Sequence, residues 1–377
     1  MSTSISAVDP DGLAEFSVVF TDRSLNHMSQ RFQQVMRDIS RVLRTLYNAD
    51  GVALVPGGGT FGMEAVARQF GSGQRCLVVR NGFFSFRWSE IFAAGGIPSE
   101  EVVLKAAQLS DAPKAPFAPL PAAEVAARIR AERPALVCMP HVETASGILL
   151  PDDYLREVSA AVKEVGGLLV LDCIASGALW VDMRATGVDV LISAPQKGWS
   201  ASPCAALVML GERAMARLAE TRSTSFACDL ARWQQIMAAY EQGGHAYHAT
   251  LPTDALVTLR DAMLETEQFG FERAREQQWA LGRAVRALLE SKGLPSVAAT
   301  GFQAPCVIVS YTDELDLHNT RRLMAEGVQT ASGVPLQCDE RPEFRTFRIG
   351  LFGLDKLSDV DGTVAVLTQA LDSALAG

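Results

Sequence analysis

Short apolar runs alternate with longer amphipathic stretches between residues 25 and 210, and this alternation constrains the fold more than any other feature of the chain. The apolar runs have the length of single strands, and the stretches between them have the periodicity of helices. Strands that are apolar along their whole length are typical of a parallel sheet with helices on both faces. The predicted strands are 52–55, 76–79, 135–139, 168–171, 188–192 and 205–210, and the predicted helices are 25–47, 63–69, 123–132 and 153–165.

The pattern changes after residue 253. One long helix is predicted over 254–291, because this stretch has few helix breakers. Beyond it, a compact α+β unit is predicted. A chain of 377 residues is too long for one small core. We therefore expect an α/β fold with a large domain at 1–265, which holds the N-terminal helical segment and a mostly parallel central sheet, and a smaller C-terminal α+β domain at 266–377. Strands are predicted at 306–310 and 345–350, and helices at 317–325 and 360–374.

Charge and cysteine content argue against several classes of function. The net charge is −9 and no basic run is present, whereas nucleic-acid binding needs clustered Lys and Arg. The seven cysteines include no CxxC pair and several lie in apolar runs, which predicts reduced core thiols in a cytoplasmic protein and no metal site. The N-terminus does not have the pattern of a signal peptide, and the apolar runs are too short for a membrane span. We expect neither nucleic-acid nor membrane binding.

A glycine-rich turn, Gly57 to Gly62, follows the first predicted strand and opens a helix. Backbone N–H groups in such a turn can approach a phosphate closely, and the Thr60 hydroxyl adds a donor. The same pattern is also typical of an ordinary turn with a helix cap, so the turn alone does not decide between the two.

Asp172 and Lys197 follow two neighbouring predicted strands and lie 25 residues apart. Ligands of open α/β sheets bind beyond the carboxyl ends of the strands, so both side chains are expected at one site. A lysine that is desolvated near other cations becomes a nucleophile. The alternatives are an ordinary turn or capping Asp and a solvated surface Lys.

Together these features meet the requirements of pyridoxal 5′-phosphate. The cofactor needs an amine for its imine, an acid that keeps its ring nitrogen protonated, and donors for its phosphate. The amine can come from Lys197 and the acid from Asp172. The phosphate donors can come from the turn with Gly58, Gly59 and Thr60.

The longest stretch around these residues, LLVLDCIASGALWVDMRATGVDVLISAPQKGW, resembles the Asp strand and Gln-Lys loop of the class V aminotransferases of fold type I. The resemblance covers about residues 25–374, and within the family the sequence closely resembles the alanine–glyoxylate and serine–glyoxylate aminotransferases. It implies that Lys197 forms a Schiff base with the cofactor and that Asp172 pairs with the pyridinium nitrogen. It also assigns Ile174 and Phe84 to the ring, Thr144 to the ring hydroxyl, Gln196 to the phosphate side and Arg348 to the substrate carboxylate.

Other interpretations remain for some of these positions. Phe84 could be an ordinary core aromatic, and Arg348 could form a surface ion pair. His141 and Glu143 fit a structural role in their loop better than a catalytic one.

The segment AYHATLP at 246–252 resembles a family segment that reaches the partner subunit's cofactor phosphate. The resemblance implies that Tyr247 and Thr250 do so here, in a homodimer with shared active sites. The alternative is a helix start with Thr250 as its cap, and both can hold at once.

The resemblance implies transfer of an amino group between a small amino acid of the alanine or serine type and a 2-oxo acid such as glyoxylate or pyruvate. A lyase or cysteine desulfurase of the same fold is the alternative, with Cys338 as an exposed sulfur acceptor. A non-catalytic regulator is disfavoured because both Lys197 and Asp172 are present. The family's usual Gly-Pro opening is missing from AEFSVVFTDRSLNHMS, which leaves the amino donor open.

Overall fold

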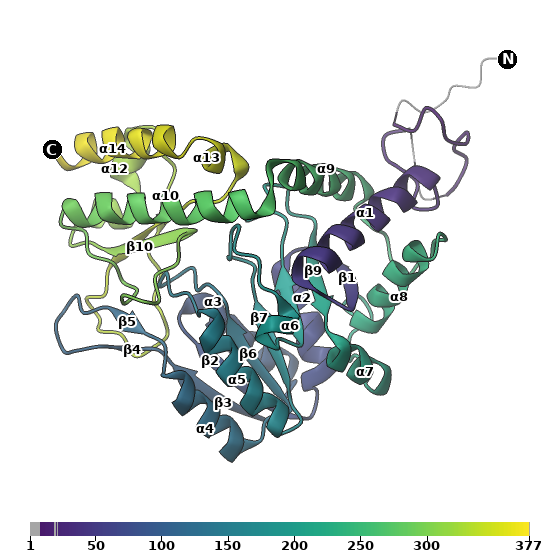
Figure 1. Cartoon of the computed structure of the whole chain (residues 1–377), viewed down its shortest axis with the longest axis horizontal. Helices are drawn as coiled ribbons and strands as arrows, with labels where there is room; N and C mark the ends of the chain where they lie inside the picture. The colour runs from purple at the N-terminus through teal and green to yellow at the C-terminus, as the bar shows by residue number, and fades with distance from the viewer. Residues whose placement is uncertain (1–7, 19, 21, 377) are drawn as a thin grey trace.

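A seven-stranded sheet forms the centre of the protein in the computed structural model, which describes residues 8–18, 20 and 22–376 (Figure 1). The order of its strands is β1-β9-β8-β7-β6-β2-β3. Neighbouring strands from β3 to β8 are parallel, and β9 is antiparallel to both β8 and β1. The predicted α/β fold with a mostly parallel sheet is confirmed. The strands are β1 (Gly51–Pro56), β2 (Arg75–Arg80), β3 (Glu100–Lys105), β6 (Leu136–Pro140), β7 (Leu168–Asp172), β8 (Val190–Ser193) and β9 (Ala205–Leu210).

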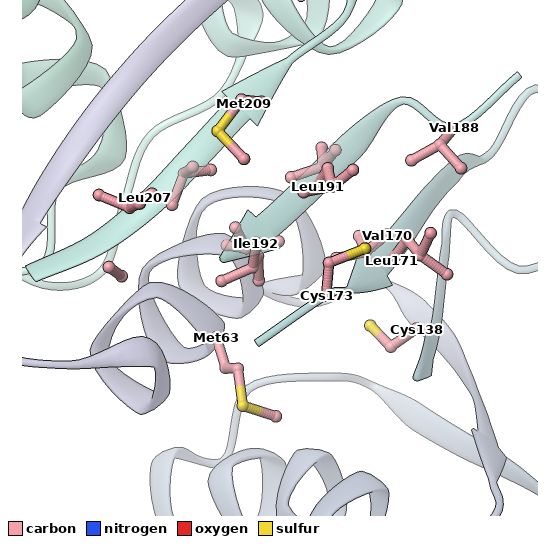
Figure 2. Packing of buried hydrophobic residues seen from close by; sticks show 14 of the residues in the cluster. Met63, Cys138, Val170, Leu171, Cys173, Val188, Leu191, Ile192, Leu207 and Met209 are labelled. Carbon is pink, nitrogen blue, oxygen red and sulfur yellow. The ribbon is translucent and has the colours of Figure 1, made fainter. Parts of the chain in front are cut away.

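The core lies on both faces of this sheet. Every residue of β6, β7, β8 and β9 is buried, and successive side chains of a strand point to opposite faces, so both faces are covered. Figure 2 shows Met63 of α2 below Ile192 of β8, with Cys138 and Cys173 among the same apolar side chains. All seven cysteines are free and buried, which agrees with their predicted place in the core.

Helices connect the strands and cover the sheet. They are α1 (Gln30–Tyr47), α2 (Gly59–Val66), which continues as a π-helical turn over Ala67–Gly71, α3 (Phe83–Gly95), α4 (Ala122–Glu132), α5 (Asp152–Glu164), α6 (Met183–Thr186), α7 (Glu212–Glu220) and α8 (Leu230–Glu241). The short strands β4 (Ala107–Gln108) and β5 (Phe117–Ala118) pair separately from the main sheet.

Two predicted helices are each divided in the structure. The long helix over 254–291 is in fact α9 (Thr253–Phe269) and α10 (Phe271–Ser291), and the prediction of one continuous helix was wrong. The break falls at Gly270, whose φ of 98° is incompatible with a helix. Likewise, 317–325 contains α11 (Leu315–His318) and α12 (Arg321–Ala325), separated by Thr320 at a φ of 70°.

A second, three-stranded antiparallel sheet lies in the C-terminal part of the chain, in the order β10-β12-β11. Helices α10 and α14 lie beside it in Figure 1, and their apolar side chains form a separate buried cluster with those of the sheet. Its remaining elements are β10 (Val307–Tyr311), β11 (Ala331–Ser332), β12 (Thr346–Gly350), α13 (Leu354–Ser358) and α14 (Val360–Ala376).

Within the described ranges, no helix combines the length and the apolar character needed to cross a membrane.

Candidate active site

A cavity of about 530 Å³ lies beyond the carboxyl ends of the parallel strands, between the main sheet and the C-terminal sheet. It collects residues from α2, α3, the loops after β6, β7 and β8, strand β12 and the segment after it, so Gly59 and Phe352, 293 positions apart, meet in one place. The predicted site residues that line it are Gly59, Thr60, Phe84, Thr144, Asp172, Ile174, Gln196, Lys197 and Arg348.

Asp172 is the last residue of β7 and is only 8% exposed. Its carboxylate accepts a hydrogen bond from the Ile174 backbone N–H at 2.9 Å. Burial raises the pKa of Asp172 to about 7, and the negative charge of Glu143 adds to this effect, while the Ile174 N–H and Arg87 oppose it. No Lys, Arg or His of the described residues forms an ion pair with this buried acid. An ionised Asp172 would therefore be stabilised by a cationic group placed in the cavity.

Lys197 lies in the turn between β8 and β9, and its Nζ is 5.0 Å from the centre of the Phe352 ring. Burial lowers the pKa of the Lys197 ammonium, and the positive charge of Arg348 lowers it further. No carboxylate among the described residues pairs with Nζ. Because a lowered pKa makes the ammonium easier to deprotonate, the Lys197 amine can act as a nucleophile and accept a proton.

The glycine-rich turn brings the start of α2 against the wall of the cavity. A Cβ built on Gly59 would lie 2.3 Å from Cδ1 of Ile174, so only glycine fits between the two. Gly58, directly before the helix, has open space around it. Helix α2 thus begins beside open space, and N–H groups at the start of a helix can bind an anion.

Phe84 lies between two guanidinium groups. The Arg87 carbon Cζ is 5.3 Å from the centre of its ring, and that of Arg348 is 5.4 Å from the same centre. Arg348 donates from Nε to the Ser332 carbonyl at 2.8 Å, and its Nη groups have no partner in the described residues. Burial lowers the pKa of Arg348, and the Glu143 charge opposes this. Because Nε is held by the Ser332 carbonyl, the two Nη groups of Arg348 remain available as donors in the cavity.

Arg87 was not predicted as a site residue. It lines the cavity and donates from Nη1 to the Thr60 hydroxyl at 3.2 Å, which links α3 to the glycine-rich turn. Its position three residues after Phe84 would have placed both on one helix face, but α3 itself was not predicted. Phe352, Gln329 and Thr330 also line the cavity and were missed, because their loops carry no sequence pattern.

His141 and Glu143 hold the loop after β6. The fully buried Glu143 accepts hydrogen bonds from the backbone N–H groups of Phe84 at 3.2 Å and Ser85 at 2.8 Å, so it fixes the start of α3. His141 bonds through Nδ1 to the Ser176 hydroxyl at 2.7 Å, and burial lowers its pKa to about 3. Both residues have the structural role expected of them.

Tyr247 and Thr250 lie outside the cavity, between α8 and α9. The Tyr247 hydroxyl is 3.3 Å from that of Thr250, and Tyr247 is 58% exposed. Within one chain, neither residue lines the cavity that holds Lys197.

Cys338 is not the exposed thiol that a sulfur acceptor requires, and that expectation was wrong. It is 5% exposed, and its thiol donates to the Arg80 carbonyl at 3.4 Å. Burial raises its pKa to about 12, so the reactive thiolate is disfavoured. The residue does not line the cavity with Lys197.

Comparisons with known proteins add four findings. The family model described as aminotransferase class V matches residues 17–338. The chain is 26% identical over 353 residues to the soluble hydrogenase small subunit of Synechococcus sp. strain PCC 6716, which covers 92% of this chain and 87% of the relative. It is 29% identical over 358 residues to a 2-aminoethylphosphonate–pyruvate transaminase of Paraburkholderia phymatum, covering 93% and 89%. The solved alanine–glyoxylate aminotransferase from Nostoc sp. matches the fold with a TM-score of 0.77, at 23% identity over 92% of this chain and 89% of that one.

Proposed function

The chain belongs to the class V aminotransferase family, and from this premise we propose that it binds pyridoxal 5′-phosphate through Lys197 and uses it for transamination. The observation that carries the proposal is the meeting of a buried, unpaired Asp172 and a desolvated Lys197 in one cavity. When bound, the cofactor supplies an electron sink that stabilises negative charge on the substrate.

The residues present fit this cofactor. Asp172 lacks a cationic partner, and a protonated ring nitrogen would provide one. The backbone at Gly58 has open space around it, as expected where a backbone lies close to a phosphate, and Gly59 lets the start of α2 pack against Ile174. Phosphate donors would come from the turn with Gly58, Gly59 and Thr60, and from Gln196.

Each remaining side chain has a role consistent with its position. Phe84 and Ile174 would pack against the ring, and Thr144 would bond its hydroxyl. Arg348 would bind the substrate carboxylate with its free Nη groups and so orient the bond that breaks. Lys197 would then take a proton from the α-carbon of the amino donor and, in the second half of the reaction, supply a proton to the α-carbon of the amino acid formed from the acceptor, since its pKa is lowered.

We propose a small amino acid of the alanine or serine type as the donor, and glyoxylate or pyruvate as the acceptor. Pyruvate in the name of the Paraburkholderia relative and glyoxylate in that of the Nostoc structure support these acceptors. Since the relative's name also includes 2-aminoethylphosphonate, this amine belongs in the same donor screen. The burial of Cys338 gives no support to a desulfurase.

A homodimer with shared sites completes the proposal. Tyr247 and Thr250 are exposed donors that do not serve the cavity of their own chain, so they are available to the partner's cofactor phosphate. The division into a large domain at 1–265 and a small one at 266–377 is supported by the separate C-terminal cluster. The free thiols support a cytoplasmic location.

The test is reduction of the purified protein with borohydride, followed by peptide mass spectrometry. The cofactor mass is expected on Lys197, in a protein that is yellow beforehand. A label on another lysine, or none after incubation with pyridoxal phosphate, would overturn the proposal. A matched control is Lys163→Ala, a lysine of α5 outside the cavity, which should leave the label unchanged.

A further inference from the structure

A second cavity of about 680 Å³ lies between α10, the start of α5 and the segment that follows β7. It is larger than the cavity around Lys197 and shares none of its lining residues. Neither the family nor the proposed chemistry gives this space a role.

Three arginines line this cavity, and their guanidinium groups have few hydrogen-bond or ion-pair partners. Arg275 and Arg283 are two turns apart on α10, with Trp279 between them, so all three lie on one face of the helix. Arg156 comes from α5. In the described part of the chain Arg156 and Arg283 have no hydrogen-bond or ion-pair partner, and Arg275 approaches Glu272 only at 3.8 Å.

The acidic residues of the cavity do not neutralise these charges directly. Asp152 and Asp153 line it at the first turn of α5, but neither forms an ion pair with the arginines. In a chain with a net charge of −9, three exposed guanidinium groups line one cavity, and among the described residues only that of Arg275 approaches a carboxylate, so together they make a local anion site.

Two indole rings belong to the apolar part of the wall, together with Leu149, Leu179 and Val181. Trp180 and Trp279 are both half-buried, and Trp180 is held by a hydrogen bond from Nε1 to the Phe271 carbonyl at 3.1 Å. An indole ring such as that of Trp180 or Trp279 offers a flat surface on which another planar ring can stack.

Trp180 also connects this cavity to the loop of Lys197. Its ring centre is 4.9 Å from that of Trp199, which is fully buried two residues after Lys197. A ligand that stacks on Trp180 therefore changes the surroundings of a side chain that packs under the Lys197 turn.

We propose that this cavity binds a planar aromatic anion, carrying either a carboxylate or a phosphate, and that its occupancy is transmitted through Trp180 to Trp199. The guanidinium groups bind the anion and the indole rings bind the aromatic plane. The ligand chemistry follows from this combination, because a simple anion would leave the indoles unused and a neutral ring would leave the arginines unpaired.

Calorimetric titration of the purified protein tests the binding. The probes are adenosine monophosphate and indole-3-carboxylate, with inorganic phosphate and adenosine as their separated halves. One equivalent of at least one aromatic anion is expected to bind per chain, more tightly than either half. Arg283→Gln and Trp279→Leu should each weaken it about tenfold or more, because each loses a charged or a stacking contact. The matched control is Arg273→Gln, an exposed arginine of α10 that lies over Phe269 and not in the cavity.

Several outcomes would overturn the proposal. These are no binding of either aromatic anion to the wild type, an affinity for phosphate alone that equals that for adenosine monophosphate, or an equal loss of affinity in Arg273→Gln.

Near-ultraviolet circular dichroism tests the transmission, since Trp180 and Trp199 are close enough for their transitions to couple. Adenosine monophosphate stacked on Trp180 and Trp279 should change the tryptophan signal in both proteins, and the transmission adds a further change in the wild type that is absent from Trp199→Phe. An identical change in both would refute the connection. None of these readouts depends on enzymatic activity.

Discussion

At the scale of single residues, burial decides the chemistry of Asp172. The sequence places this acid at the end of an apolar strand, but its lack of a cationic partner becomes visible only in the structure. Desolvation raises the pKa of Asp172 in the cofactor-free protein, and for the same reason the ionised carboxylate is stabilised when a cation binds beside it.

The first prediction concerns Asp172→Asn. The folded-state pKa of about 7 exceeds the usual value of 3.8, so the folded protein binds a proton that the unfolded chain releases. The stability from this proton is fully present below about pH 4 and is lost as the pH rises to about 7. The melting temperature of the cofactor-free wild type should therefore fall over this range relative to that of Asp172→Asn. The prediction is contradicted if the melting temperatures of the two proteins change in parallel between about pH 4 and about pH 7.

The same variant should lose activity when the cofactor is present. A neutral amide cannot stabilise a protonated ring, so turnover should fall about a hundredfold or more while cofactor attachment to Lys197 persists. Single-turnover kinetics with alanine measures the effect. Activity within a few-fold of the wild type would remove Asp172 from this role.

The second prediction concerns Arg348→Lys. A point charge replaces a fork whose Nε is fixed by the Ser332 carbonyl, so carboxylate binding loses both strength and orientation. KM should rise and kcat should fall, for a combined loss in kcat/KM of about tenfold to a hundredfold. The control substrate is a primary amine without a carboxylate. An equal loss with this amine would argue against carboxylate recognition.

At the scale of elements, the turns place the site residues, and the strands and helices hold the turns in position. The Lys197 turn packs directly on the segment after β7: a Cβ on Gly198 would lie 2.1 Å from the Gly177 carbonyl oxygen. Because that contact is with backbone, no side-chain movement can relieve it.

The third prediction follows from this contact. Gly198→Ala should displace the Lys197 turn and lower cofactor occupancy, measured as absorbance per chain. Gly243→Ala serves as a control for adding a methyl group in open space, since nothing lies within 4 Å of its Cβ, although its φ of 81° carries a strain of its own. Full occupancy in Gly198→Ala would show that the turn can shift without consequence.

The sequence predicted the buried strands well because an uninterrupted apolar run admits few alternatives. It did not predict β3, whose sequence EEVVLK is partly exposed at the sheet edge, or α3, whose aromatic residues show no clear helical face. The break at Gly270 was missed because one glycine within a helical pattern is often tolerated. Arg87 was missed together with its helix.

At the scale of the whole molecule, the site is incomplete in one chain if the proposed dimer is correct. Nine of the twelve predicted site residues line one cavity; Gly58 precedes the helix at its wall, while Tyr247 and Thr250 do not reach it. A single sequence can indicate such a pair only through its resemblance to a family. The spacing of residues along one chain gives no information about which of them contact a second chain.

The fourth prediction tests this arrangement by subunit exchange. Inactive Lys197→Ala chains are mixed with chains weakened by Tyr247→Ala and Thr250→Ala. In a mixed dimer, one site combines an intact lysine with the intact hydroxyls of the other chain. Activity per mixed dimer should approach half that of a wild-type dimer, so the activity of the mixture should rise above that of either parent. Confirmed exchange by native mass spectrometry without such a rise would refute shared sites.

The antiparallel strand β9 has a consequence for how the chain reaches its native state. Strand β1, which leads into the glycine-rich turn, lies at the edge of the sheet, and its neighbour there is β9. A ribosome must therefore synthesise Leu210 before β1 can be fully paired. Closing a loop of this length is slow, because its entropy is lost before the contacts form. Cofactor capture should thus be a late event in biogenesis, and a nascent chain that is released too early would expose an unpaired apolar strand to aggregation.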